Sequence, residues 1–596
     1  MRLITVTNCC LSFIIALIPA SALSQVSVGW ETSCDYDVTA DPQALQTALD
    51  AGHAEIRLTH QNDYAGVIDI TQNVYLRGGY ADCAAANNDN QTTTRAVLDG
   101  SGQERAVLRM DSVEGADIQL ELLTIRNGDG TLANQPGGLE IKNLTGQVAL
   151  DQLDIRDNIG ATGGGIAIDS NSALKEGALN VVITDTAIRD NVATRGGGLS
   201  CDTFHSAVDI QLHLSGGTTL RDNHATVGGG AIHMQSCQLD FEAGIANTVV
   251  GSNLEDEIFR NTSQTSGAGL ALFDTARVIL RGNPEHAFDL SNNEGNLDQS
   301  TSGAGGAAQV GSDAELEIVN GNITGNSSGR YGGALFASFG GKILVRRDPA
   351  GCSYGSFCSR IVGNRLTGTF PGGGGALAAR FGGEISVYNT LFWLNSSDEH
   401  GYIGYAESQQ DGQDATLHLE GNVIYDNAQI SEDSNPTAVH LRAESRATLA
   451  YNTFFRNKAQ SIILSQSSDS SLKAVGNILD EPGNIHQASG TVDTEINCNL
   501  VRSLDSIETA VIDTFEGTPD YVDTSSQDFR LAADDTVAID VCSTTPYTPG
   551  VDMGGQPRGL DRVDVIDLNG PFDLGAYEFN PAALDQIFSD VFEQGL

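Results

Sequence analysis

Short stretches of alternating apolar and polar residues recur along the chain. In 182–188 every second residue shares one face, and in 199–201 two apolar positions flank a position that varies between copies. A period of two is typical of β-strands with one face turned inward. The stretches are short, rich in β-branched residues and bounded by Gly, Asn and Asp, so none has the pattern of a good helix. The pattern therefore predicts many short strands.

One kind of stretch ends on an asparagine three residues after an apolar position, which only the first copy breaks, with Thr124. Successive asparagines lie 30 to 38 residues apart, the spacing of a stacked repeat. A unit of two or three short strands at this period predicts an all-β solenoid, the parallel β-helix, and known examples of this length are mostly right-handed. The asparagines are Asn127, Asn158, Asn191, Asn223, Asn261, Asn293, Asn326, Asn364, Asn395, Asn427 and Asn457.

A glycine-rich turn follows the asparagine in six of the repeats, as in the run from Gly196 to Gly198. We expect the asparagine to turn the chain, because Asn tolerates the left-handed region, and its amide to bond to the asparagine of the next coil. We expect the glycines to take positive φ and to let neighbouring corners approach closely. A dinucleotide-binding loop is excluded, since no crossover helix follows. The two 38-residue steps, which end at Asn261 and Asn364, predict extruded loops.

The net charge of the chain excludes some classes of binding partner. With 77 acidic and 32 basic residues among 596, the net charge is −45. Such a surface repels nucleic acid and anionic lipid, so we expect neither as a partner. Dispersed carboxylates mostly solubilise a surface; they could also attract Ca²⁺, but no motif supports a Ca²⁺ site and we predict no cofactor.

The N-terminus has the features of a secretory signal peptide. Arg2 precedes an apolar run from Leu11 to Ile18, and Ala22 and Ser24 suit cleavage after Ser24. No later stretch is apolar for about 18 residues, so we expect no transmembrane span. The protein is therefore predicted to be secreted or to lie on the outer cell surface.

Eight cysteines follow the expected cleavage point, and an even number in an exported chain predicts disulfides. Their order favours four pairs that are local in sequence, the second being the least certain because its spacing exceeds one repeat. A zinc site is disfavoured, because no two are spaced as CxxC. The expected pairs are Cys34–Cys83, Cys201–Cys237, Cys352–Cys358 and Cys498–Cys542.

Two regions of the sequence resemble known families. The pairing of [FIL]xxN with GG[AG][IL] over roughly residues 120–460 resembles the polymorphic outer-membrane proteins of chlamydiae and the secreted, pectate-lyase-like β-helix proteins of bacteria. The C-terminal sequence with Asp573, Gly575, Ala576, Tyr577 and Glu578 resembles the choice-of-anchor Q module. The resemblances imply a right-handed β-helix and a surface or secreted protein, and say almost nothing of its activity.

The ends of the stack need covers. A short capping helix is predicted after Asp41, which we expect to be its N-cap, with Leu45 and Leu49 toward the first coil and Gly52 after its end. An apolar stripe in 583–596 predicts a second helix, either a lid or a sorting tail. The predicted division is a signal peptide at 1–24, cap and first coils at 25–100, β-helix repeats at 101–480, a closing module at 481–582 and an amphipathic tail at 583–596.

No catalytic set emerges from the sequence. A polysaccharide lyase of this fold needs carboxylates for calcium and an Arg or Lys base, and a hydrolase needs paired aspartates with Gly-His-Gly. Asp398, Glu399 and His400 come nearest and match poorly. Four histidines crowd neighbouring coils without metal-ligand spacing: His205, His213, His224 and His233. We therefore assign no catalytic, cofactor-binding or metal-ligating residue.

Two charged columns are expected on neighbouring coils. Arginines precede aspartates in three successive repeats, and in a parallel stack these would form ladders of opposite charge about 4.8 Å apart. They would either neutralise each other on a solvated face or form a strip that binds acidic sugars or calcium. The residues are Arg156, Arg189 and Arg221, and Asp157, Asp190 and Asp222.

Three classes of function fit these observations. The leading hypothesis is a non-catalytic, adhesin-like protein whose lateral surface binds a glycan or a protein. The alternative is a secreted polysaccharide lyase or hydrolase acting on acidic polysaccharide, and in that case the two 38-residue coils offer the loop length for a cleft. The third class is a structural component of a surface layer or matrix.

Overall fold

The computed structural model describes most of residues 25–580. The expected signal peptide and the expected tail lie outside the described residues. Within 25–580, the description leaves out 133, 171–175, 204–206, 245–256, 266, 296–302, 354–356, 369–371, 409–412, 431–435, 459–460, 466–468, 482–483, 489–492, 508–510, 544–550 and 562–569.

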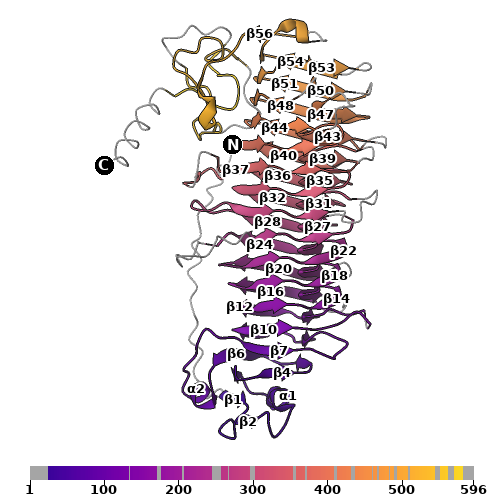
Figure 1. Ribbon diagram of the computed structural model, residues 1–596, viewed down its shortest axis with the longest axis vertical. Coiled ribbons are helices and arrows are strands. Elements are labelled where there is room, and N and C mark those ends of the chain that lie inside the picture. The colour runs from indigo at the N-terminus through magenta and orange to yellow at the C-terminus, as the bar shows by residue number, and fades with distance from the viewer. Residues whose placement is uncertain are drawn as a thin grey trace, which may run out of the picture.

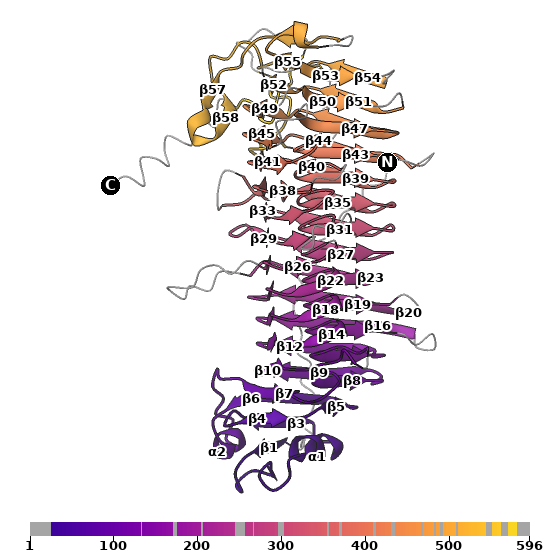
Figure 2. The same ribbon diagram turned by 45° about the vertical axis from the view of Figure 1, so that its right-hand side comes forward.

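The chain forms a right-handed parallel β-helix, as the sequence predicts (Figure 1 and Figure 2). A typical coil contributes one strand to each of four sheets: β16 (Glu176–Thr184) to sheet A, β17 (Ala187–Arg189) to sheet B, β18 (Val192–Arg195) to sheet D and β19 (Leu199–Asp202) to sheet C. Sheet D holds 9 of the described strands against 14 to 17 in the others, so it covers only the middle coils.

Apolar side chains of successive coils stack inside the solenoid. Ile155, Ile188 and Leu220 are in register and fully buried, and they belong to one continuous core. Burying a side chain of this size contributes roughly 1.5–3 kcal/mol. The alternation along each strand thus fixes which face points inward.

The predicted asparagine column is present. Asn191 is fully buried, and its Nδ2 donates to Asn223 Oδ1 at 3.1 Å and to the carbonyl of Ile155 at 2.9 Å. Its Oδ1 accepts from the backbone N–H of Asn158 at 3.1 Å and from Asn158 Nδ2 at 3.0 Å. The same bonds link each asparagine to the next as far as Asn457.

The first copy of the column was predicted wrongly. Ile125 pairs with Ile155, so Gly128 holds the column position and its N–H donates to Asn158 Oδ1 at 2.9 Å. Asn127 lies one residue earlier and donates to Asp99 instead. The first repeat therefore starts the column without an asparagine, which also explains why Thr124 seemed to break the apolar position.

The asparagines do not themselves turn the chain, contrary to our expectation. The residue before each one has positive φ, as at Asp157 (57°), Asp190 (56°) and Asp222 (55°). These aspartates point to solvent, while the asparagines that follow stay outside the left-handed region and point inward. Two adjacent residues thus have separate roles: the first turns the chain, and the asparagine that follows supplies the buried amide.

The glycine turns are as predicted. Gly163 and Gly196 have φ of 59° and 62°. A Cβ on Gly164 would lie 2.5 Å from the carbonyl oxygen of Gly197 on the next coil. Side chains are excluded there because the backbones of adjacent coils touch.

Coils become shorter toward the C-terminal end, and a second asparagine column appears at the corner between sheets A and B. Here Asn422, Asn452, Asn477 and Asn499 are fully buried and linked through their amides. Their separations fall from 30 to 25 to 22 residues. Earlier coils use threonine at this corner, since Thr186 Oγ1 accepts from the N–H of Leu153.

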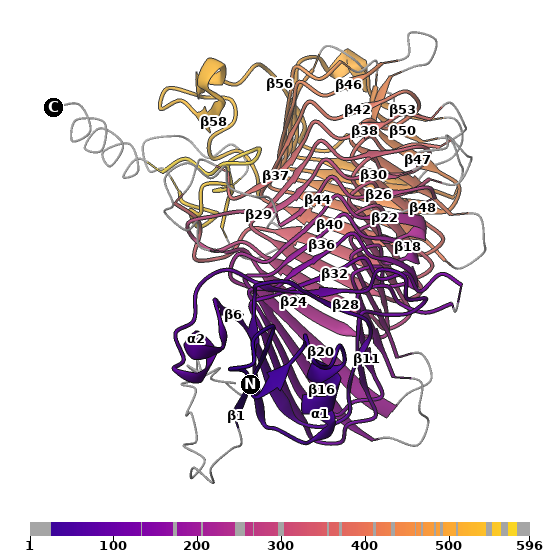
Figure 3. The same ribbon diagram turned by 60° about the horizontal axis from the view of Figure 1, so that its bottom comes forward.

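Helix α1 (Ala44–Asp50) lies at the N-terminal end of the stack, as Figure 3 shows. Its Leu45 and Leu49 are buried in the main core, as predicted. The N-cap is Gln43 rather than Asp41, whose carboxylate instead accepts from the N–H of Gln43. A second helix, α2 (Cys83–Asn87), lies beside the first coils.

Parallel pairing continues to β54 (Asp493–Asn497) in sheet A and β56 (Phe515–Glu516) in sheet B. Beyond them the chain lies beside the upper coils, where β57 (Tyr521–Asp523) and β58 (Asp528–Leu531) form an antiparallel pair (Figure 2). Phe529 packs there with Val423. We call residues 518–580 the lateral module; the domain boundaries given above stay a prediction.

All four predicted cysteine pairs are bonded, with Cα–Cα separations of 5.1, 6.3, 5.6 and 5.7 Å in chain order. The second pair, the least certain from spacing, joins Cys201 on β19 of sheet C to Cys237, which directly precedes β24 (Gln238–Glu242), the second sheet A strand after it in sequence. Among the helices of the described residues, none is long and apolar enough to cross a membrane.

Candidate functional site

A groove of about 600 Å³ lies on the outer face of sheet A. It runs across four neighbouring strands, and we call it the sheet A groove. The strands are β28 (Arg277–Arg281), β32 (Glu315–Val319), β36 (Lys342–Arg346) and β40 (Glu384–Tyr388). A smaller hollow of about 250 Å³ on earlier strands of the same face shares Arg277 with it. Together they favour a ligand that extends along the stack.

Charges alternate along one edge of the groove. Strand register places Arg277, Glu315, Lys342 and Glu384 side by side on successive coils. The Arg277 and Glu315 side chains approach to 3.7 Å and are both at least half exposed. Because the signs alternate, this edge of the groove has no net charge. It offers a ligand hydrogen-bond donors and acceptors in turn.

The deeper part of the groove combines an ion pair with an aromatic ring. Arg346 donates to Glu317 Oε1 from Nε at 2.8 Å and approaches it through Nη2 at 2.7 Å. Burial raises the pKa of Tyr388, whose ring lies 5.2 Å from the ring of His418. Ser386, two residues before Tyr388 on β40, is the register partner of His418 and also lines the groove. These groups suit hydrogen bonding to hydroxyls and carboxylates.

One wall of the groove comes from the extruded loop that the 38-residue step before Asn364 predicted. This loop follows β36 and brings Arg347, Asp348 and Pro349 to the groove. The Cys352–Cys358 disulfide closes it near its end. The extra residues of the other long step, 245–256, lie outside the described residues.

The lateral module reaches the same wall. Arg347 Nη1 donates to the carbonyl of Met553 at 2.8 Å, and Asn389 Nδ2 donates to that of Val551 at 3.1 Å. Val551 itself lines the groove. Residues separated by more than 160 positions in sequence therefore build the site together.

The signature of the module is buried and holds backbone in place. The Asp573 carboxylate accepts from the N–H groups of Asp540 and Phe579, and Glu578 accepts from those of Gly559 and Leu560. Burial, followed by the nearby charge of Glu578, raises the pKa of Asp573. These two carboxylates therefore serve the fold of the module rather than a surface site.

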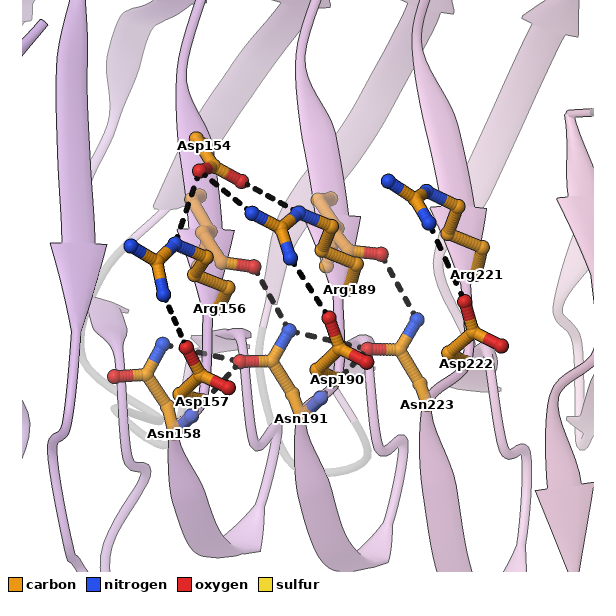
Figure 4. A network of polar contacts seen from close by, with 12 residues as sticks. Asp154, Arg156, Asp157, Asn158, Arg189, Asp190, Asn191, Arg221, Asp222 and Asn223 are labelled. Carbon is orange, nitrogen blue, oxygen red and sulfur yellow. Dashed lines mark hydrogen bonds and ion pairs between the residues drawn. The ribbon is translucent and has the colours of Figure 1, made fainter. Parts of the chain in front are cut away.

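The predicted charged columns are in register and pair with each other (Figure 4). Arg189 bonds to Asp190 at 2.8 Å and to both carboxylate oxygens of Asp154 at 3.0 Å. Asp154 also accepts from Arg156, a role the sequence analysis missed. Mutual neutralisation thus accounts for these columns.

The predicted histidines are not brought together. His213, His224 and His233 lie on three different sheets, and His205 lies outside the described residues. Burial lowers the pKa of His233 to about 4, which keeps it neutral against the ring of Phe273. Within the described part of the chain, no group of three or more His, Cys, Asp or Glu could hold a metal ion.

His400 belongs to an aromatic cluster on sheet C rather than to a charged triad. Its ring stacks on that of His440 at 4.5 Å, and His440 stacks on Tyr405. Asp398 instead approaches Arg365 at 3.5 Å. Burial, with a smaller contribution from the charge of Asp398, raises the pKa of Glu399.

Sequence reasoning missed the groove because its residues are unremarkable one at a time. A usable signal was the alternation of charge at the start of successive sheet A strands, at Arg277, Glu315, Lys342 and Glu384. Comparison with models of known protein families finds no match, and comparison with curated proteins finds none either.

Proposed function

We propose that this protein is exported and binds an extended glycan in the sheet A groove without transforming it. The groove carries the proposal, because it is elongated, mixes charged and hydroxyl groups, and is walled by a loop and the lateral module. Extended hollows on rigid sheets suit long ligands with repeated hydroxyls.

Export is supported by the four disulfides, which persist in oxidising compartments. The signal-peptide pattern at residues 1–24 and the resemblance to secreted β-helix proteins agree with it. The resemblance of the C-terminal sequence to the choice-of-anchor Q module supports a protein that is secreted or lies on the outer cell surface.

The test is a glycan array on the purified chain, followed by titration calorimetry with each glycan that binds. Lys342→Gln removes a groove cation, and Lys473→Gln is the matched control, because Lys473 lies on the same outward face beyond the groove. We expect the first variant to lose binding and the second to keep it. Equal loss in both, or no binding by the unmodified chain, would contradict the proposal.

A polysaccharide lyase is the second candidate, favoured by the presence of Lys342 and Arg346 beside Glu315 and Glu317 in one groove. A lyase of acidic polysaccharide needs an Arg or Lys side chain that, once deprotonated, acts as the base near carboxylates. Incubation with pectate or alginate, followed by ultraviolet absorbance for unsaturated uronides, separates the two functions. If the unmodified chain forms this product and Lys342→Gln or Arg346→Gln does not, the lyase would replace the binding protein as the proposed function.

A further inference from the structure

Two phenylalanines occupy an unusual backbone position beside the groove. At the corner between sheets C and A, most turning residues are small or polar and have positive φ, as at Asn143, Ser236 and Asp274. Phe339 and Phe381 hold this position in two successive coils, with φ of 51° and 48°. A bulky residue is strained in this region, and strain of this kind concentrates at functional sites.

The two rings form the end of an ordered stack. Phe339 and Phe381 lie 5.0 Å apart with an angle of 19° between their planes. The guanidinium of Arg380 lies 4.3 Å from the Phe381 ring and 4.2 Å from the Tyr331 ring. Arg380 is itself fixed by Glu407 at 2.8 Å. The stack is therefore rigid before any ligand arrives.

Phe339 nevertheless remains open to solvent. Its side chain is 53% exposed, whereas Tyr331 at the inner part of the stack is 5% exposed. If Phe339 served only the fold, we would expect its ring to be buried. Alternatively, we would expect the turn to carry Asn or Ser, as it does in other coils. The protein instead holds an aromatic ring at its surface in a strained conformation.

The rings lie next to the sheet A groove along the chain. Phe339 precedes Lys342 by three residues, and Phe381 precedes Glu384 by three. Both intervening pairs are glycines that turn tightly, with the N–H of Gly341 donating to Ser338 and that of Gly383 to Arg380. The same turn on two coils thus joins an aromatic ring to a groove charge.

We propose that Phe339 and Phe381 form a stacking subsite for a pyranose ring at the edge of the sheet A groove. This inference rests on the proposed function and specifies its ligand as a polysaccharide of pyranose units. The C–H-rich face of such a ring packs on the exposed aromatic ring, while its hydroxyls and those of neighbouring units bond to Lys342 and Glu384. Aromatic rings bring large apolar contact at little cost in side-chain entropy.

The test uses Phe339→Asn, which installs the residue that another coil has at this corner, Asn143. We expect the melting temperature to stay equal or rise, because strain is relieved, and the affinity for cellohexaose or hexagalacturonate to fall about three- to tenfold. Phe339→Tyr should retain binding. Leu394→Asn is the matched control, because Leu394 is also exposed (50%) with φ of 54° but lies at the corner between sheets B and D rather than beside sheet A.

The outcomes separate this inference from the proposed function. If Phe339→Asn binds normally while Lys342→Gln does not, the subsite is refuted and the groove stands. If Phe339→Asn melts well below Leu394→Asn, the rings serve the fold and the subsite is again refuted. If the unmodified chain binds another glycan of the array but neither hexasaccharide, the subsite is refuted and the proposed function stands. If it binds no glycan of the array, both proposals fail.

Discussion

The coils around residues 155–224 and those around residues 315–389 share one interior but differ outside. In the first region, the outward charges of sheet B pair with each other, as Arg189 does with Asp154. In the second, a loop and the lateral module enclose the outward face of sheet A. The repeated interior is therefore a scaffold, and irregular additions to it create the site.

The largest expected effect breaks the shared interior. Asn191→Asp should destabilise the fold by more than about 3 kcal/mol, because a buried carboxylate would face the carbonyl of Ile155 and the Oδ1 of Asn223. Asn191→Ala should cost about 1–3 kcal/mol. Denaturant unfolding measures both, with the exposed Asn134→Asp as control. Equal stability of Asn191→Asp and the unmodified chain would contradict a buried amide column.

The second effect concerns the wall of the groove. Replacing Cys498 and Cys542 with Ser should destabilise the attachment of the lateral module by up to about 4 kcal/mol, because this bridge closes a segment with a sequence separation of 44. Cys352–Cys358, with a separation of 6, should contribute only about 2 kcal/mol. Limited proteolysis should cleave the module first in the former variant; cleavage unchanged from the unmodified chain would contradict this attachment.

The third effect tests the end of the asparagine column. Glu481 replaces asparagine there, and its Oε1 accepts from the N–H and the Nδ2 of Asn457, both at 2.8 Å. Burial raises the pKa of Glu481 from 4.5 to about 7. The folded state keeps a proton that the unfolded chain releases in this range, so stability falls as pH rises from 4.5 through about 7.

Glu481→Gln should remove this dependence. The variant should match the unmodified chain at pH 4 and be more stable at pH 8 by about 1–3 kcal/mol, because its amide stays neutral. Thermal melts across this pH range measure the difference. A difference that is the same at both pH values would show that Glu481 does not titrate as proposed.

The smallest effect lies two residues from the largest. Arg189→Ala should change stability by less than about 1 kcal/mol, since its ion pairs are partly exposed and the neighbouring column residues can pair again. Measuring the unfolding free energies of Arg189→Ala and Asn191→Ala together compares an outward-facing and an inward-facing residue of one coil. A cost above that of Asn191→Ala would reverse the roles assigned to the two columns.

Several features of the fold were predictable because they repeat. The asparagine column and the glycine turns follow from spacing in the sequence, whereas the four disulfides follow from the order of the cysteines. Spacing failed at the first copy, where Asn127 lies one residue from the column position, and at the second column. There the separations fall to 25 and 22 residues, so a search for a constant period passes over Asn452 and Asn477.

The sequence by itself determined the period, the inward face of each strand and the buried corners, because each depends on residues within one coil or its neighbour. Only the tertiary structure decided which outward charges meet and where a groove forms. Val551 reaches Asn389 across 162 positions, and no local pattern encodes such a contact. The exposed ring of Phe339 is three residues from Lys342 in the sequence, but the groove that Lys342 lines forms only when the strands of four coils stack.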